Sequence, residues 1–379
     1  IMNFLVDRLA FRNALQRVEM GIDRKPTNPM YGGVLIEAQN DCLILMTNDL
    51  DMSVRYRLDF VQVTTPGWAV IPGRELVDII KDLESDTVTL MLTKNNQVEM
   101  LAGEDKCTLV TLDSSNSSSA DKSESFPVAP SCDIEADVVM DKNDFLTMVN
   151  STRFATSKVQ NSRFATEGIL LETKEDRMTM VGTDGRRLAC ILRNITSESS
   201  ASHRAVLLPK VLDQIYRFGQ NEDGEEIKIW YLGNQVGFQI GNLESFGRVL
   251  TGEFPDYSQV LNVSGTSSVN AHRESFSKKL RLASHLTNDS AAVVRLKLSD
   301  NNMEISSEAD GRGRASANFE VDYSGDEINT AFNPSFLMDG LKAAHSEAIE
   351  IELEDASKPA KFILGHDFFY IVMPLSSLV

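Results

Sequence analysis

Histidine and cysteine side chains hold metals and carry covalent steps in many proteins, and their spacing limits which chemistry a chain can perform. The four cysteines, Cys42, Cys107, Cys132 and Cys190, form no Cys-x-x-Cys pair. The five histidines are scattered, with no HExxH motif and no pair at helical spacing. We therefore expect no metal and no cofactor, and we expect reduced thiols in a cytoplasmic protein.

Two glycine-containing phrases come nearest to a catalytic loop. DGRGR at Asp310 lacks the spacing of a dinucleotide-binding GxGxxG motif, and neither a Walker A loop nor a GxSxG elbow occurs. TDGRRLA at Thr183 is more simply a hairpin turn at Asp184-Gly185 between two apolar runs, because glycine accepts a positive φ. These residues make an enzyme a weak hypothesis.

The distribution of charge differs from the net charge. The chain has 37 basic and 55 acidic residues, for a formal net charge of −18. Yet three segments (8–25, 151–163 and 271–281) each hold an excess of basic residues. One such segment is most simply a solvated helix face, but three repeated ones indicate a single surface that faces a polyanion. An acidic exterior around that surface favours a protein that surrounds nucleic acid without gripping it.

The elements that would carry these segments repeat three times. Amphipathic helices are predicted from Phe11, Phe145 and Phe276, each followed by a hairpin of alternating apolar residues. A second helix then begins at or near Pro72, Pro209 or Pro334, since proline is favoured in a first helical turn. Two more alternating strands follow each second helix.

The repeat predicts an α+β fold of three modules, each with two helices on antiparallel sheet. We expect an N-terminal domain at 1–128, a central domain at 129–261 and a C-terminal domain at 262–379. The serine-rich stretch after Leu112 marks the first junction. No apolar run is long enough to span a membrane.

Four phrases occur in order along this repeat: RKPTNPMYGGVLIE from Arg24, TDGRRLA from Thr183, EFPDYSQVL from Glu253 and YIVMPL from Tyr370. Together they resemble the bacterial DNA sliding clamp family, the β subunit of DNA polymerase III, over the whole chain. The resemblance implies a DNA-clamp architecture: a ring-shaped, head-to-tail homodimer that encircles double-stranded DNA. It implies a processivity factor that is not an enzyme. Its partners would be the DNA polymerase III catalytic subunit, the clamp loader and other clamp-binding repair proteins.

The resemblance also implies a peptide-binding cleft between the second and third modules. Its residues would be Arg163, Thr166, Thr183, Gly185, Arg186, Arg187, Leu188, Pro255, Val260, Asn333, Phe336, Val372, Met373, Pro374 and Leu375. Thr166, Arg186 and Gln259 depart from the usual family residues, which leaves the exact peptide preference open. Residues 376–379 extend past the usual end.

DNA contacts and a dimer contact follow from the same resemblance. Arg24 and Gln160 match the family's DNA positions, and the charge pattern adds Lys25, Arg153, Lys158, Lys278 and Arg281. In the dimer, Cys107 and Leu109 of the run KCTLVTL would meet the region of His285 and Leu286.

Two other hypotheses stay open on the residues alone. One is a repeat-built, peptide-binding scaffold that never encircles DNA, and the other is an unrecognised enzyme. A test of retention on circular against linear DNA separates the ring from the scaffold.

Overall fold

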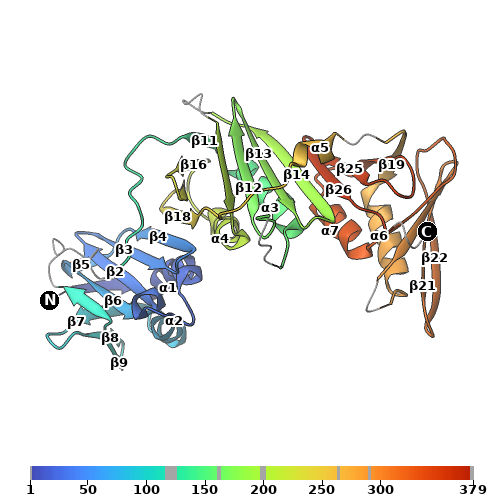
Figure 1. The fold of residues 1–379 in the computed structure, drawn as a ribbon. Coiled ribbons are helices and arrows are strands. Elements are labelled where there is room, and N and C mark those ends of the chain that lie inside the picture. Colours follow the sequence, from blue (N-terminus) through green and yellow to red (C-terminus); the bar gives the residue numbers. More distant parts are fainter. Residues whose placement is uncertain are drawn as a thin grey trace. The chain divides into compact units, whose positions relative to one another are not determined.

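The computed structural model is an α+β protein and describes residues 2–115, 126–159, 164–196, 202–262, 265–288 and 292–375 (Figure 1). It comprises two compact units. Unit 1 holds residues 1–146, 195–200 and 210–249, and unit 2 holds residues 147–194, 201–209 and 250–379. In the described residues, no helix is both long and apolar enough to cross a membrane.

The first module is built from two helices and antiparallel strands. Asp7 caps its first helix by accepting a hydrogen bond from the Ala10 N–H, and the predicted face of Phe11, Leu15 and Val18 is buried. Its elements are β1 (Asn3–Asp7), α1 (Arg8–Val18), η1 (Glu19–Gly21), η2 (Pro29–Gly32), β2 (Gly33–Gln39), β3 (Cys42–Asn48), β4 (Met52–Leu58), β5 (Gln62–Thr65), β6 (Gly67–Pro72), α2 (Gly73–Asp82), β7 (Thr87–Leu92), β8 (Gln97–Ala102), β9 (Asp105–Val110) and β10 (Asp113–Ser115).

The second module repeats this order. Glu175, in the turn of its first hairpin, has a positive φ of 56°. Asn40 and Asn301 also have a positive φ, of 29° and 54°, in the corresponding turns of the other two modules. Its elements are β11 (Val138–Asp141), α3 (Lys142–Thr152), η3 (Arg153–Ala155), β12 (Ile169–Lys174), β13 (Arg177–Thr183), β14 (Arg187–Asn194), β15 (His203–Leu207), α4 (Pro209–Gly219), β16 (Glu226–Tyr231), β17 (Gln235–Ile240) and β18 (Leu243–Arg248).

The third module follows after a short helix, α5 (Tyr257–Leu261). Asn333 caps its second helix through the Ser335 N–H, with Pro334 in the first turn as predicted. Its elements are β19 (Ser267–His272), α6 (Arg273–Ser284), β20 (Val294–Ser299), β21 (Asn302–Ala309), β22 (Gly313–Glu320), β23 (Ile328–Phe332), α7 (Pro334–Ala343), β24 (Ala348–Leu353), β25 (Ala360–Gly365) and β26 (Phe368–Val372).

Two large sheets run from one module into the next. The nine-stranded sheet has the order β10-β6-β2-β3-β4-β18-β17-β16-β11, and the eight-stranded sheet has the order β15-β12-β13-β14-β26-β25-β24-β19. We call the β4–β18 pairing the first seam and the β14–β26 pairing the second seam. The last strand of a module therefore completes the sheet of the module before it. The predicted domain limits stay predictions, because these sheets cross them.

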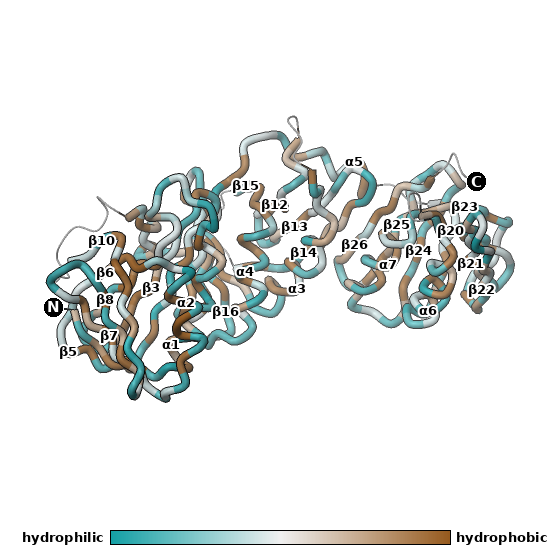
Figure 2. Tube along the Cα trace, turned by 90° about the horizontal axis from the view of Figure 1, so that it is seen from below, coloured by the Kyte–Doolittle hydropathy of each residue, from teal (hydrophilic) through white to brown (hydrophobic). Residues whose placement is uncertain are grey.

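Two smaller sheets hold the strands left over. Their orders are β5-β1-β7-β8-β9 and β22-β21-β20-β23. Hydrophobic stretches lie on strands such as β3 and β6 and alternate with hydrophilic turns (Figure 2). Among the described residues, β9 and β22 are end strands of these two sheets. Like the other end strands, each pairs on one side only and presents an open edge.

Candidate functional site

The turn between β13 and β14 is tightly hydrogen-bonded. The Asp184 Oδ1 accepts from the backbone N–H groups of Arg186 and Arg187, at 2.9 and 3.0 Å. The Thr183 hydroxyl donates to the Arg187 carbonyl at 2.7 Å. Gly185 has a φ of +82° and open space where a Cβ would lie. The predicted Asp-Gly hairpin is therefore confirmed.

Arg187 is buried, and its guanidinium is engaged inside unit 2. Nε donates to Asp184 Oδ2 at 3.1 Å, Nη1 to Asp339 Oδ2 at 2.7 Å and Nη2 to the Phe154 carbonyl at 2.9 Å. The same group lies 4.4 Å from the ring centroid of Phe336. The place of Arg187 in the peptide-binding cleft stays a prediction. Its contacts within the chain tie the turn to α7 and to η3.

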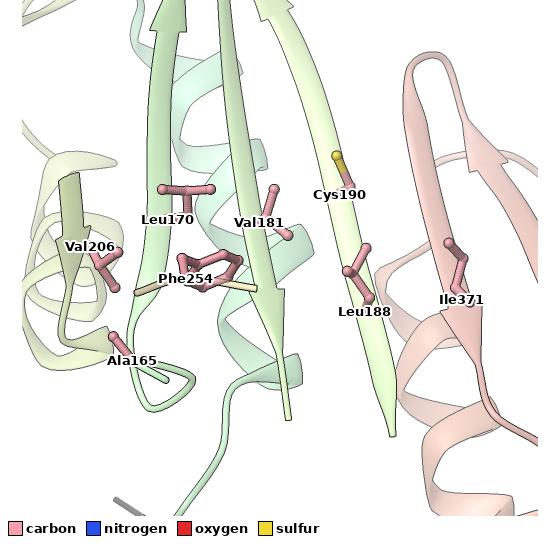
Figure 3. Close-up of a cluster of buried hydrophobic side chains, with 8 residues drawn as sticks. All are labelled: Ala165, Leu170, Val181, Leu188, Cys190, Val206, Phe254 and Ile371. Atoms are coloured by element: carbon pink, nitrogen blue, oxygen red, sulfur yellow. The ribbon is translucent and has the colours of Figure 1, made fainter. Parts of the chain in front are cut away.

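A cluster of apolar side chains lies beside this turn (Figure 3). Leu188 on β14 and Ile371 on β26 face each other across the second seam, and Leu188 is only 5% exposed. Val260 of α5 packs against the cluster. The cluster comprises Ala165, Leu170, Val181, Leu188, Cys190, Val206, Phe254 and Ile371.

The chain continues past Ile371 of the cluster to Met373, which comes directly after β26. Met373 is 43% exposed, and its N–H donates to the Arg186 carbonyl at 2.9 Å. Leu375 donates its N–H to the Ala331 carbonyl at 2.7 Å. A buried apolar floor with a partly exposed methionine at its rim is suited to anchoring a large apolar side chain.

The other residues predicted for the cleft have mixed surroundings. Val372 and Thr166 are buried, while Pro255 and Pro374 are half-buried. The Asn333 side chain is used as the helix cap of α7. Arg163 lies outside the described residues.

The thiol in the cluster is not poised for chemistry. Burial raises the pKa of Cys190 to about 12, so it stays protonated at neutral pH. The Tyr257 hydroxyl donates to Glu172, and burial together with this carboxylate raises the pKa of the tyrosine. Among the described residues, no group of three or more His, Cys, Asp or Glu could hold a metal.

A histidine links two helical regions at the second seam. The Nε2 of His345, just after α7, lies 3.0 Å from the hydroxyl of Ser151 on α3. Its ring stacks on Phe368, with centroids 5.1 Å apart. Burial, with a smaller effect of the Arg193 charge, lowers the pKa of His345 below its ordinary value of 6.5.

The basic residues predicted for DNA are distributed over both units. Arg24 and Lys25 are exposed in unit 1, after η1, and Lys158 is exposed in unit 2. Arg153 opens η3, half-buried, and donates to Asn150 Oδ1 at 3.3 Å. Gln160 lies outside the described residues.

On α6, Lys278 and Arg281 are both exposed. Lys278 forms an ion pair with Glu274 at 2.7 Å, and such exposed pairs contribute little stability. Both side chains can therefore turn toward a phosphate at small cost.

The residues predicted for the dimer lie at an open edge and at a helix end. Cys107 and Leu109 are half-buried on β9. His285 and Leu286 follow the last turn of α6, exposed and half-buried respectively. Sequence reasoning missed β22, an end strand of the four-stranded sheet, although the alternating run RASANFE after the DGRG turn could have indicated it. It also missed Asp339, for which the sequence carries no signal.

The architecture, in which the sheets of repeated α+β modules join edge to edge, is that of DNA clamps. Three family models match consecutive parts of the chain: the N-terminal domain of the DNA polymerase III beta subunit at residues 2–118, its central domain at 139–256 and its C-terminal domain at 259–375. The chain belongs to the DNA polymerase III beta subunit family.

Relatives and solved structures agree with this family over nearly the whole chain. The beta sliding clamp of Chlamydia muridarum is 26% identical over 374 residues, covering 99% of each chain. That of Escherichia coli K12 is 25% identical over 376 residues, covering 99% of this chain and all of the relative. The Pseudomonas aeruginosa DNA polymerase III subunit beta superposes with a TM-score of 0.89 at 25% identity, covering 99% and 100%. The Bacillus subtilis sliding clamp, at 21% identity, shares the fold with a TM-score of 0.91, covering 99% of each chain.

Proposed function

We propose that this chain is a DNA polymerase processivity factor that works as a ring-shaped homodimer, encircles duplex DNA and holds polymerases through a peptide cleft. The single observation that carries the ring is the pair of open edges, β9 and β22. Within the chain, β4 and β14 are each completed by the last strand of the next module, β18 or β26. In the third module β22 is the counterpart of β4 and β14, and in the first module β9 is the counterpart of β18 and β26. Two copies can therefore pair β22 with β9 twice and close six modules into a ring.

The register of this contact follows from the two internal seams, which share one register. Arg55 lies opposite Glu244 in the first seam, and Cys190 lies opposite Phe369 at the equivalent position of the second. Counting from the same hairpin turns transfers this register to the open edges. Three pairs between the two copies are then Lys106 with Ser316, Cys107 with Ala315, and Leu109 with Gly313.

The DNA contact is proposed to be electrostatic and weak at each residue. The candidates Lys25, Lys158, Lys278 and Arg281 are exposed long side chains, and Arg24 is an exposed one that also lines a cavity of about 1120 Å³ in unit 1. Contacts of this kind depend on phosphate charge and not on base sequence, and they weaken steeply with salt. A protein that slides needs such contacts, because a tight one would hold it in place.

The partner site is proposed to be the cluster at the second seam with Met373 at its rim. It would take a short extended peptide with adjacent large apolar side chains, carried by the polymerase catalytic subunit, the clamp loader and repair proteins. Thr166 and Arg186 would adjust which peptides fit. We propose that the protein binds DNA and its partners without catalysing a reaction, and that it does so in the cytoplasm.

The deciding experiment is retention on DNA of different topology. The protein, loaded by a clamp loader onto nicked circular duplex, is followed through gel filtration before and after the circle is cut once. We expect it to remain on the circle and to leave the linear product, since only a closed ring is held by topology. Equal loss from both forms would favour a scaffold that does not encircle DNA. Equal retention on both would favour direct gripping.

A further inference from the structure

A segment between the first two modules lies along the first seam as an extended chain. Residues Phe126–Pro130 (FPVAP) form neither helix nor strand. Phe126 is fully buried, and Ala129 is 6% exposed. Both belong to an apolar cluster with Leu35, Met46, Trp68, Val70 and Phe246.

Side chains of the first seam bind the backbone of this segment. The Asn48 Nδ2 donates to the Pro127 carbonyl at 2.8 Å. The Arg55 Nη2 donates to the carbonyls of Ala129 and Pro130, at 2.9 and 3.3 Å. Arg55 is itself held by Glu244 at 2.5 Å, with its guanidinium 5.8 Å from the ring centroid of Phe246. Apolar anchoring combined with donors to main-chain carbonyls is the way proteins bind short extended peptides.

The residues that bind the segment have counterparts at the second seam. Counted from the hairpin turns of the two modules, the equivalent pairs are Met46 and Val181, Asn48 and Thr183, Arg55 and Cys190, and Phe246 and Ile371. Val181, Cys190 and Ile371 belong to the cluster of the proposed peptide cleft. Phe254 occupies the position in this cluster that Phe126 occupies in the cluster of the first seam. The chain after Phe254 does not stay extended but enters α5, whose N-terminus is capped by Asp256.

We propose that the first seam carries a second copy of the peptide groove, and that residues Phe126–Pro130 occupy it as a built-in ligand. The groove accepts an extended apolar peptide with a phenylalanine anchor, followed by carbonyls that meet Asn48 and Arg55. Its comparison with the second seam rests on the proposed function. Because the ligand is tethered, its effective concentration is on the order of millimolar, which excludes free peptides at lower concentration. Each protomer then offers one open cleft and not two.

The test weakens the built-in ligand and supplies it from outside. The probe is acetyl-Phe-Pro-Val-Ala-Pro-amide at millimolar concentration. It is added to full-length wild type, Phe126→Ala and Phe126→Leu, two variants that weaken the built-in ligand and keep Asn48 and Arg55 of the groove. The matched control is Phe145→Ala, which removes an equally buried ring that contacts Phe238 and not the segment. Circular dichroism first establishes that each variant is folded. We expect the probe to raise the thermal midpoint of Phe126→Ala by a few degrees and that of Phe126→Leu by less, and to leave wild type and Phe145→Ala unchanged.

Two results would overturn the proposal: no shift in either folded Phe126 variant, or an equal shift in Phe145→Ala. If Phe126→Ala does not fold, Phe126→Leu carries the test, since it keeps an apolar side chain at the anchor position. Repeating the series with Met373→Ala in every protein removes the rim of the second-seam cleft. A shift that survives there belongs to the first seam, even if the proposed partner site were wrong.

Discussion

The register proposed for the dimer can be tested with one engineered cysteine. Cys107 is expected to lie opposite Ala315 of the second copy, so Ala315→Cys sets two thiols across the contact. The equivalent internal pairs are Val54 with Ser245 and Ala189 with Tyr370. In both seams they fall between hydrogen-bonded positions, as shown by the bonds from the Arg57 N–H to Asn242 and from the Leu192 N–H to Asp367.

The distance between the two Cα atoms decides whether a disulfide can form. Opposed residues of this non-hydrogen-bonded kind have Cα atoms about 4.5 Å apart. Disulfides need Cα separations of roughly 4.4–6.8 Å, so Ala315→Cys is within reach of Cys107. The matched control is Ser316→Cys, which lies about 3.3 Å further along the strand and points to the opposite face. That displacement takes its thiol out of reach.

The assay is a non-reducing gel after mild oxidation of the purified protein. We expect Ala315→Cys to move from 42.0 kDa to twice that mass, and Ser316→Cys to stay monomeric on the gel. Adding Cys107→Ala should abolish the cross-link, since Cys42 and Cys190 are buried and the half-buried Cys132 lies outside β9. Failure of Ala315→Cys to cross-link, or cross-linking by Ser316→Cys instead, would refute the register and with it the equivalence of the three seams.

Four further outcomes follow from the structure. Leu109→Asp should give a monomer at micromolar concentration in light scattering, because an unpaired carboxylate in a strand contact costs several kcal/mol; a dimer of unchanged mass would exclude this edge. Reversing Arg24 and Lys278 to Glu should reduce loading and retention on circular DNA with an unchanged thermal midpoint; unaltered retention would remove them from the DNA surface. Met373→Ala should weaken a polymerase-tail peptide several-fold in calorimetry, about 1 kcal/mol, whereas deleting residues 376–379 should matter less; equal affinity for Met373→Ala and wild type would remove this cleft. The lowered pKa of His345 means that its contribution is fully present above pH 6.5 and is lost as the pH falls below that value, so urea unfolding at pH 7.5 and 5.5 should show a larger loss for wild type than for His345→Gln.

Local patterns predicted the local structure well. The apolar spacing of Phe11, Leu15 and Val18 fixed a helix face, and the prolines near α2, α4 and α7 marked helix starts, because both signals act within one or two turns. The pairing of β4 with β18 could not be predicted in the same way. It joins residues nearly two hundred positions apart, and neither strand carries a mark of its partner.

In the candidate site, too, some features could be predicted from the sequence and others depended on long-range packing. Leu188 and Met373 were predicted beside one another through the family resemblance, and backbone pairing of β14 with β26 brings their strands together. The partners of Arg187 within the chain, Asp339 and Phe154, could not be predicted, because they are known only once α7 and η3 are packed against the turn. A charged residue in a sequence does not show whether its donors are free or already used.

If the proposed contact between β9 and β22 is equivalent to the two internal seams, a closed ring needs a fixed number of modules and not a fixed number of chains. A chain ending at residue 261 would lack β26 and would leave β14 open, while β9 would remain open at its other end. Because β14 is equivalent to β22, the shortened chain would still carry one edge of each kind in the same register. If six modules complete the circle, three such chains would close it where two full-length chains do. Subunit stoichiometry would then be set by where the gene stops, and the diameter of the circle by the angle at each seam.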